Sequence, residues 1–401
     1  MLFQNGEPEA LRLPLAMLLV FGGAKLMAEI FERFRQPAIV GEILAGIIIG
    51  PSVLGWMTPN ELLTTLADLG VMFLLFRVGL EVKASDLMKV GGTAALVAFL
   101  GVVLPFFLGW GVMLLWGEPQ VEAIFTGAAM VATSVGITAQ VLASKGLLNL
   151  RASRIILAAA VIDDVLGLLV LALVSGLARG KVNVLELATT GVLALGFTLL
   201  VAKWGGRAMG RVVGRLHGKL QMQEAQFTMA MVLLFTLSVL AVYVGVAAII
   251  GAFLAGMAVG ESVGRRVHDL AHGVTELLVP FFLVGIGLHF DLHEFTAPST
   301  LLLAFIILAA AVFSKFVGCG LGAIRLGRAD AARVGVGMVP RGEVGMVVAQ
   351  IGLGLGVVPK HIYGVVVFMA VATTLVAPPL LSLAFRNAQK TEGEEEVFHL
   401  G

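Results

Sequence analysis

Long hydrophobic runs separated by short polar stretches occupy almost the whole chain. A helix of about 20 apolar residues spans the hydrocarbon core of a bilayer, and most of the runs are close to this length. The pattern therefore predicts an all-α polytopic membrane protein with thirteen transmembrane helices. The predicted segments are 11–31, 37–56, 62–80, 92–116, 121–143, 154–177, 184–206, 224–245, 246–261, 275–290, 298–324, 331–355 and 361–385.

Composition indicates the same class of protein. Hydrophobic residues make up 59% of the 401 positions and charged residues 13%, and the mean hydropathy is +1.00. So few charges cannot cover the surface of a soluble protein of this length. The net charge of +1 gives no reason to expect a nucleic-acid partner. The single cysteine, Cys319, excludes a disulfide framework and a thiolate metal cluster.

Basic residues between the segments are distributed unevenly. In the thirteen-helix arrangement, nineteen lysines and arginines lie on one side of the membrane and four on the other. Because basic loops stay in the cytoplasm, we expect the N-terminus outside the cell and a cytoplasmic tail at 386–401. Arg207, Arg211, Arg215 and Lys219 form a basic stripe on the cytoplasmic side, which we interpret as an anchor to lipid headgroups.

The chain also repeats itself at an offset near 209. Five helices in each half correspond, and the two units begin seven crossings apart, so they lie in opposite orientations in the membrane. Inverted repeats are typical of secondary transporters and are hard to explain in a receptor or a structural protein. The matching stretches are Val40–Gly50 with Ile250–Gly260, Phe73–Leu80 with Phe281–Leu288, Met130–Gly136 with Met338–Gly345, and Ala160–Asp164 with Ala370–Thr374.

Charged residues inside a segment are costly, so they indicate a partner or a water-filled path. Asp163 and Asp164 stand near the middle of one segment and Lys315 near the middle of another. Neighbouring residues point about 100° apart on a helix, so one aspartate can face a cation path while the other pairs with Lys315. A purely structural ion pair is the alternative. Against it, the equivalent residues Thr373 and Thr374 are neutral, so the fold does not require the acids.

Two segments hold helix-breaking residues at matching positions. The first contains Thr133 and Ser134, and the second contains Pro340 followed by Arg341, Gly342 and Glu343. Helices that break near the midplane direct carbonyl groups and partly charged helix ends toward an ion. We therefore predict two discontinuous crossing helices. Arg341 and Glu343 either belong to the ion pathway or neutralise the helix dipoles.

Charges closer to the helix ends receive a simpler interpretation. Lys25, Glu42 and Arg77 lie near the predicted cytoplasmic ends of their helices. We expect their side chains to extend to the membrane surface.

These features resemble the monovalent cation:proton antiporter-2 family, most closely its NapA-type bacterial sodium/proton antiporters. The resemblance extends over about residues 15–385. The stretches that carry it are QPAIVGEILAGIIIGP (36–51), FLLFRVGLE (73–81), VATSVGITAQVL (131–142), RIILAAAVIDDVLGL (154–168), SK (314–315) and PRGEVGMV (340–347).

The resemblance implies a homodimer in the bacterial inner membrane, built from one transmembrane unit, 1–385. Its dimerisation part would be about 11–80 and 224–290, its linker helix about 184–206, and its ion-translocating core about 92–177 and 298–385. Asp164 would carry the transported Na⁺ and the proton, and Asp163 would pair with Lys315. Thr133 and Ser134 would lie at the helix crossing near the ion.

The function expected from these residues is exchange of cytoplasmic Na⁺ or Li⁺ for external H⁺, with net movement of charge. The cation and the protons are expected to compete for the buried pair Asp163 and Asp164, whose carboxylates supply oxygen ligands. A carboxylate that binds either a proton or a cation, but not both at once, is sufficient for such exchange. Potassium/proton exchange, a sodium-coupled solute symporter, and an ion sensor or channel remain as alternatives. We expect neither enzymatic activity nor a cofactor, since the sequence shows no nucleophile–base pair, phosphate loop or metal-ligand cluster.

Overall fold

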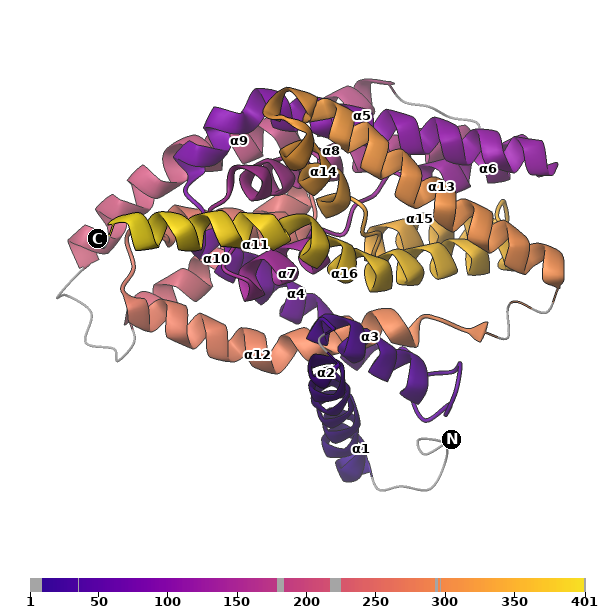
Figure 1. Cartoon of the computed structure of the whole chain (residues 1–401), viewed down its shortest axis with the longest axis horizontal. Helices are drawn as coiled ribbons and strands as arrows, with labels where there is room; N and C mark the ends of the chain where they lie inside the picture. The colour runs from indigo at the N-terminus through magenta and orange to yellow at the C-terminus, as the bar shows by residue number, and fades with distance from the viewer. Residues whose placement is uncertain are drawn as a thin grey trace.

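The computed structural model describes residues 9–34, 36–178, 184–216, 225–292, 295 and 297–399. All regular secondary structure in these residues is helical (Figure 1). The prediction of an all-α protein is therefore confirmed.

Nine helices in the described ranges are long and apolar enough to cross a membrane. They account for nine of the thirteen predicted segments. The first is continuous through α1 (Glu9–Met17), a π-helical turn η1 (Leu18–Gly22) and α2 (Gly23–Arg33). The others are α4 (Glu61–Glu81), α5 (Ala84–Trp116), α8 (Arg151–Ala178), α9 (Val184–Leu216), α10 (Ala225–Tyr243), α12 (Arg265–Leu288), α13 (Pro298–Gly322) and α16 (Lys360–His399). Because α16 continues to His399, the predicted cytoplasmic tail begins as an extension of this helix.

Two of the remaining segments hold single helices that are shorter than predicted. These are α3 (Ala38–Ile49) and α11 (Ala248–Val259), each of 12 residues. Twelve residues extend about 18 Å, less than the hydrocarbon thickness of about 30 Å. The helix predicted over 37–56 ends early because Gly50 is extended and Pro51, which follows it, has no backbone N–H to donate.

The other two segments are interrupted helices. The first consists of α6 (Gln120–Ala129) and α7 (Val135–Ser144). The second consists of α14 (Arg328–Gly337) and α15 (Glu343–Gly354), and the short 3₁₀ turn η3 (Ile324–Leu326) precedes α14. Both interruptions lie where the sequence placed its helix-breaking residues.

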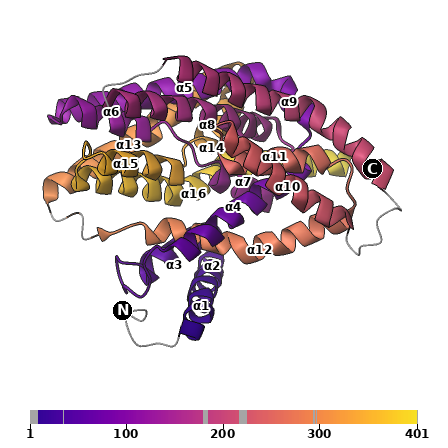
Figure 2. The ribbon, with the colours of Figure 1, turned by 180° about the vertical axis from the view of Figure 1, so that it is seen from behind.

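The helices form two groups (Figures 1 and 2). The first group contains α2, α3, α4, α10, α11 and α12, which pack on one another. The second contains α5 to α8 and α13 to α16, with α5 and α13 side by side. Helix α9 packs against α11 of the first group and α8 of the second. The long N-terminal helix of α1 and α2 extends away from the rest of the molecule (Figure 1).

Close backbone contacts recur at the same offset as the sequence repeat. Gly46 of α3 lies against the backbone at Gly287 of α12, and Gly256 of α11 lies against the backbone at Gly79 of α4. None of these positions has room for a Cβ atom, so the helices touch through their backbones. The second group shows a related pair of contacts: Gly127 lies against the Phe106 carbonyl, and Gly335 against the Phe316 carbonyl.

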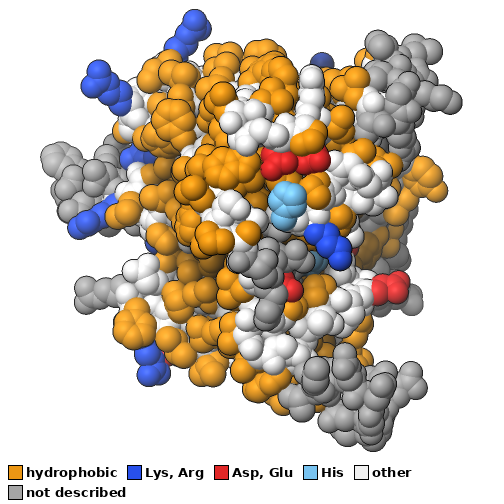
Figure 3. All heavy atoms as spheres, turned by 90° about the vertical axis from the view of Figure 1, so that its right-hand side faces the viewer, with side chains coloured by type: hydrophobic (Ala, Val, Ile, Leu, Met, Phe, Trp, Pro, Cys, Tyr) orange, Lys and Arg blue, Asp and Glu red, His pale blue; other side chains and the backbone are white. Residues whose placement is uncertain are grey.

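Hydrophobic side chains cover most of the surface that Figure 3 shows, which is the right-hand face of Figure 1. A small group of acidic, basic and histidine side chains interrupts them near the centre of this face. Large apolar side chains are also exposed on many helices, among them Leu115 and Leu18. Such a surface is suited to contact with lipid rather than with water.

Candidate functional site

The two helix interruptions meet inside the second helix group. The backbone N–H of Ser134 donates a 2.8 Å hydrogen bond to the carbonyl of Pro340. The hydroxyl of Thr138 donates a 2.7 Å hydrogen bond to the carbonyl of Gly337. Residues about 200 positions apart are therefore joined at one point, and backbone groups that a continuous helix would have paired find partners across the crossing.

Two hydroxyl side chains lie at this crossing, and both are buried. Ser134 faces Gly342, because a Cβ atom added to that glycine would lie 2.6 Å from the Ser134 Oγ. Thr133 Oγ1 is buried and makes no hydrogen bond within the described residues. A buried hydroxyl oxygen normally has a partner, so Thr133 is available as an oxygen ligand for a small ion.

Asp163 and Lys315 form a completely buried ion pair. The distance from Lys315 Nζ to Asp163 Oδ1 is 2.8 Å, and both side chains have an exposed fraction of 0%. The structure thus brings α8 and α13 together through opposite charges. Lys315 already balances the charge of Asp163. The Asp163 carboxylate is therefore a poor candidate for binding the transported cation.

Asp164 faces a different environment from its neighbour. Its exposed fraction is 8%, and it borders a small cavity whose other lining residues are all apolar. These residues come from both helix groups: Leu75, Ile249, Ile250 and Phe253 from the first, and Val135, Leu157 and Val161 from the second. Asp164 therefore lies at the interface between the groups, next to Val135, the residue at which α7 begins.

Arg341 is also completely buried, and its guanidinium binds backbone carbonyls. Nη1 donates to the carbonyls of Val131 and Ala132, and Nη2 donates to that of Ala311, each over 3.2 Å. Val131 and Ala132 follow Met130, the C-cap residue of α6, so the positive charge of Arg341 lies close to the partly negative C-terminus of that helix. These contacts favour neutralisation of the helix dipole as the role of Arg341. Glu343 is the first residue of α15, but its side chain lies outside the described part of the structure.

The two threonines that replace the aspartates in the second repeat make different contacts. Thr373 accepts a 3.0 Å hydrogen bond from the backbone N–H of Arg341, which ties α16 to the second interruption. Thr374 donates only to the carbonyl of Val371 in its own helix, over 2.7 Å. One of the two positions thus supports the crossing.

This difference predicts unequal effects of two otherwise similar substitutions. Thr373→Val leaves the buried N–H of Arg341 without its acceptor, so we expect a loss of about 1–3 kcal/mol in the free energy of unfolding. Thr374→Val removes only a bond within one helix and serves as the matched control, with a loss below about 1 kcal/mol. Denaturant titration of the purified variants measures both values. Equal losses would show that the contact with Arg341 contributes nothing.

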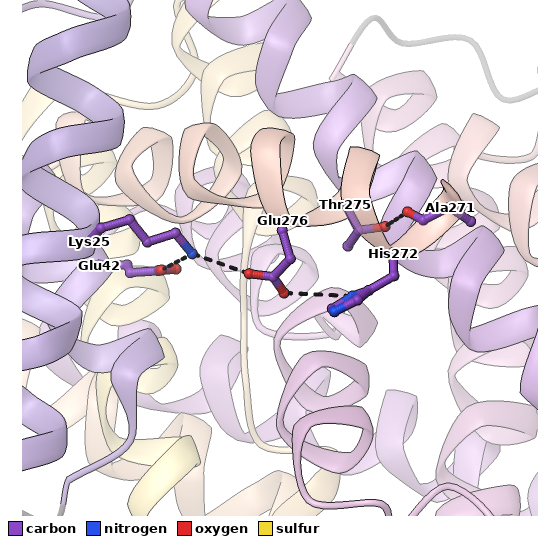
Figure 4. A network of polar contacts seen from close by, with 6 residues as sticks. All are labelled: Lys25, Glu42, Ala271, His272, Thr275 and Glu276. Atoms are coloured by element: carbon purple, nitrogen blue, oxygen red, sulfur yellow. Dashed lines mark hydrogen bonds and ion pairs between the residues drawn. The ribbon is translucent and has the colours of Figure 1, made fainter. Parts of the chain in front are cut away.

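A polar network that the sequence analysis missed joins three helices of the first group (Figure 4). Lys25 Nζ lies 3.4 Å from Glu42 Oε1 and 3.4 Å from Glu276 Oε2. His272 Nδ1 lies 3.9 Å from the other oxygen of Glu276. The expectation that Glu42 extends to the membrane surface is wrong, because Glu42 is buried and pairs with Lys25, whose side chain is 39% exposed.

This network borders a cavity of about 900 Å³ between the two helix groups. The cavity wall includes Gln140 and Lys145 of the α7 region and Pro379 and Ser382 of α16. Among the described lining residues there are four glutamates and two lysines, a negative balance of charge that attracts cations.

Comparison with known proteins places this arrangement in a family. Residues 16–386 match the family model described as the transmembrane sodium/hydrogen exchanger. The chain belongs to the sodium/hydrogen exchanger family. This exchanger is 33% identical over 380 residues to the Na⁺/H⁺-K⁺ antiporter GerN of Bacillus cereus, covering 93% of the chain and 96% of GerN. It is 31% identical over 430 residues to the high-affinity Na⁺/H⁺ antiporter NhaS3 of Synechocystis, covering 95% and 92% of the two chains.

Solved structures show the same fold. The exchanger superimposes on the sodium proton antiporter MjNhaP1 of Methanocaldococcus jannaschii with a TM-score of 0.73 and 17% identity, covering 95% of this chain and 97% of that one. The family model and the two relatives confirm the resemblance to a monovalent cation:proton antiporter family. The exchanger is a multi-pass membrane protein whose relatives transport ions.

Proposed function

We propose that this exchanger exports cytoplasmic Na⁺ or Li⁺ in exchange for external protons, with Asp164 as the group that carries both. One observation carries the proposal: Asp164 lies at the interface of the two helix groups, beside the helix crossing, while the adjacent Asp163 is already paired with Lys315. The chain therefore presents one carboxylate to the interface and keeps the other neutralised.

Competition for Asp164 couples the two ions. A small hard cation prefers oxygen ligands. The Asp164 carboxylate and the hydroxyls of Thr133 and Ser134 would provide them, since those residues directly precede Val135 at the edge of the same cavity. A proton on Asp164 removes its negative charge and with it the attraction for Na⁺. Asp164 therefore holds one ion or the other, but not both at once.

Alternating access follows from movement of the second helix group against the first. We infer two inverted five-helix repeats and thirteen crossings, in which α3 and α11 complete one crossing each and the interrupted pairs α6–α7 and α14–α15 complete two more. The recurring glycine contacts support this inference, since the same backbone approach occurs in both halves. In such an architecture, exchange of the two halves' conformations produces the opposite-facing state.

The membrane setting completes the proposal. The bias of basic residues favours an external N-terminus and a cytoplasmic C-terminus in the bacterial inner membrane. The large negatively balanced cavity then opens toward the cytoplasm, because Lys145 borders it.

We propose a homodimer through the parts 11–80 and 224–290. The exposed apolar side chains of the protruding N-terminal helix, such as Leu26 and Phe34, provide surface for such a contact.

Everted membrane vesicles from a host without its own antiporters test this function. Respiration acidifies the vesicles, and addition of Na⁺ or Li⁺ is expected to collapse the pH gradient, as monitored by a fluorescent amine. Potassium/proton exchange is the second candidate, because the relative GerN is named a Na⁺/H⁺-K⁺ antiporter. If only K⁺ collapses the gradient, the transported cation is K⁺ and not Na⁺ or Li⁺. No response to any of the three cations would favour a solute symporter or an ion sensor.

Exchange is expected to be electrogenic, with two protons imported for each sodium ion exported. The motivation is that Asp164 and the Asp163–Lys315 pair together offer two groups that take up protons. Net movement of one charge couples exchange to the membrane potential by about 2.3 kcal/mol per 100 mV. In proteoliposomes with a potassium diffusion potential set by valinomycin, the rate of sodium transport should change with the sign of the potential. A rate independent of the potential contradicts this stoichiometry.

A further inference from the structure

A second cavity, of about 320 Å³, lies between the two helix groups at the opposite end of the protein. Positions along α16 show the separation: Tyr363 borders this cavity, whereas Ser382 borders the larger one. The two residues are nineteen positions apart on one helix, which corresponds to about 28 Å. The rest of its wall comes from α4, α12 and α15, so this cavity also opens at the interface that includes Asp164.

Asp68 of α4 is the one acidic side chain in the described wall of this second cavity. It is exposed, and it lies seven residues inside the helix, at a depth of about 10 Å. A carboxylate at such a depth is strongly disfavoured against lipid, so it marks a water-filled space. Lys and Arg are missing from the described lining, and the one histidine there, His289, has its Nδ1 2.7 Å from the carbonyl of Gly285 in its own helix.

The internal repeat relates Asp68 to Glu276 of the larger cavity. The two residues are 208 positions apart, the same offset that separates Gly79 from Gly287. Glu276 is held by Lys25, as Figure 4 shows. For the first helix the offset is 210, because Gly41 lies against the Met27 carbonyl as Gly251 lies against the Leu237 carbonyl. The position that corresponds to Lys25 is therefore Phe235, which has no charge. The two halves therefore place a carboxylate at each end of the interface, but only one of the carboxylates has a lysine beside it.

The facing wall of each cavity is also similar. Gln140 of α7 borders the larger cavity, and Gln350 of α15 borders the smaller one. Helices α7 and α15 are the corresponding halves of the two interrupted helices. Each cavity thus sets a carboxylate of the first helix group opposite an amide of the second, which is an arrangement of oxygen atoms suited to a partly hydrated monovalent cation.

We propose that Asp68 lines the external mouth of the ion pathway, as the counterpart of Glu276 at the cytoplasmic mouth, and draws cations toward Asp164 from outside the cell. The assignment of the Asp68 cavity to the external side and of the Glu276 cavity to the cytoplasmic side rests on the function proposed above. Asp68 is a positioning residue: its charge raises the local concentration of cations without binding the ion at the carrier site.

Thiol accessibility tests the pathway without any need for transport. Cys319 is completely buried, so the parent protein is the unlabelled reference. In intact cells, an impermeant maleimide should label the Asp68→Cys variant and react little with the Glu276→Cys variant. In everted vesicles, it should label the Glu276→Cys variant and react little with the Asp68→Cys variant. The apolar neighbours Leu69 and Leu277 are 208 positions apart and provide matched controls, since Leu69→Cys and Leu277→Cys should react at least about tenfold more slowly. Labelling of the Asp68→Cys variant from the cytoplasmic side, or from neither side, overturns the proposal.

Transport kinetics provide the second readout. For Asp68→Asn we expect the KM for external Na⁺ to rise about threefold to fivefold during sodium import, with the maximal rate and the KM for cytoplasmic Na⁺ unchanged. Asp68→Glu keeps the charge and should keep the parent KM. An unchanged external KM in Asp68→Asn, or equal changes on both sides, overturns the proposal. If instead the parent protein exchanges no ions but the labelling pattern holds, the proposed function fails while the pathway stands.

Discussion

Asp164→Asn is expected to reduce sodium-dependent proton movement to the background of vesicles that lack the protein. Asparagine has nearly the same shape as aspartate, so packing around the small cavity is kept. It carries no charge and binds no proton in the physiological range, so it loses both the attraction for Na⁺ and the ability to exchange it for H⁺. Everted vesicles with Na⁺, Li⁺ and K⁺ added in turn measure the effect.

A second aspartate provides the matched control for this substitution. Asp330 forms a partly exposed ion pair with Arg333 at 2.7 Å, near the start of α14 and therefore at the end of that helix that lies away from the interruption. Because exposed pairs contribute little, Asp330→Asn should exchange ions at close to the parent rate. Both variants must be present in the membrane in equal amounts. If Asp164→Asn exchanges Na⁺ as fast as Asp330→Asn, the assignment of the carrier is wrong.

Removal of Lys315 is expected to cause the largest loss of stability. Lys315→Ala leaves the Asp163 carboxylate completely buried without its only recorded ion-pair partner within the described residues. An uncompensated buried charge costs about 3–5 kcal/mol in the free energy of unfolding. The double variant Asp163→Asn with Lys315→Met removes both charges and keeps the volume, so it should recover most of this loss. Denaturant titration of the purified proteins compares the three variants with the parent.

The exposed pair between Arg33 and Glu29 is the reference for this comparison. Their side chains are 2.9 Å apart and largely open to solvent, so Arg33→Met should cost less than about 1 kcal/mol. Recovery in the double variant identifies the unpaired charge, rather than a lost packing contact, as the cause of the instability. A double variant that is as unstable as Lys315→Ala contradicts this account.

Much of the fold could be predicted from the sequence because a bilayer limits the possible structures. In hydrocarbon, each backbone polar group must be satisfied internally, so a hydrophobic run of sufficient length has to form a helix. The interruptions at Ser134 and Pro340 were also visible, since proline and clustered glycines cannot continue a helix without loss of hydrogen bonds. Likewise, the need of a buried lysine for a counter-charge pointed from Lys315 to the aspartates.

Side-chain partners that depend on tertiary packing were not predictable in the same way. Arg341 binds carbonyls at the end of α6, more than 200 residues earlier in the chain, and no local pattern indicates which carbonyls these are. Glu42 was assigned to the membrane surface because hydrophobicity alone does not show that Lys25 lies between it and Glu276. The early end of α3 was missed for a different reason. Gly50 and Pro51 marked it, but the apolar residues beyond them continued the hydrophobic run.

Proton release on sodium binding tests the central claim most directly, because it reports the competition itself. Addition of Na⁺ to the purified exchanger in weakly buffered detergent solution, at a pH where Asp164 is partly protonated, should release protons in a saturable manner. The Asp164→Asn variant should release none, and Asp330→Asn should behave as the parent does. Saturable sodium binding without proton release from the parent, or equal release from the Asp164→Asn variant, would contradict a shared site for Na⁺ and H⁺ at Asp164.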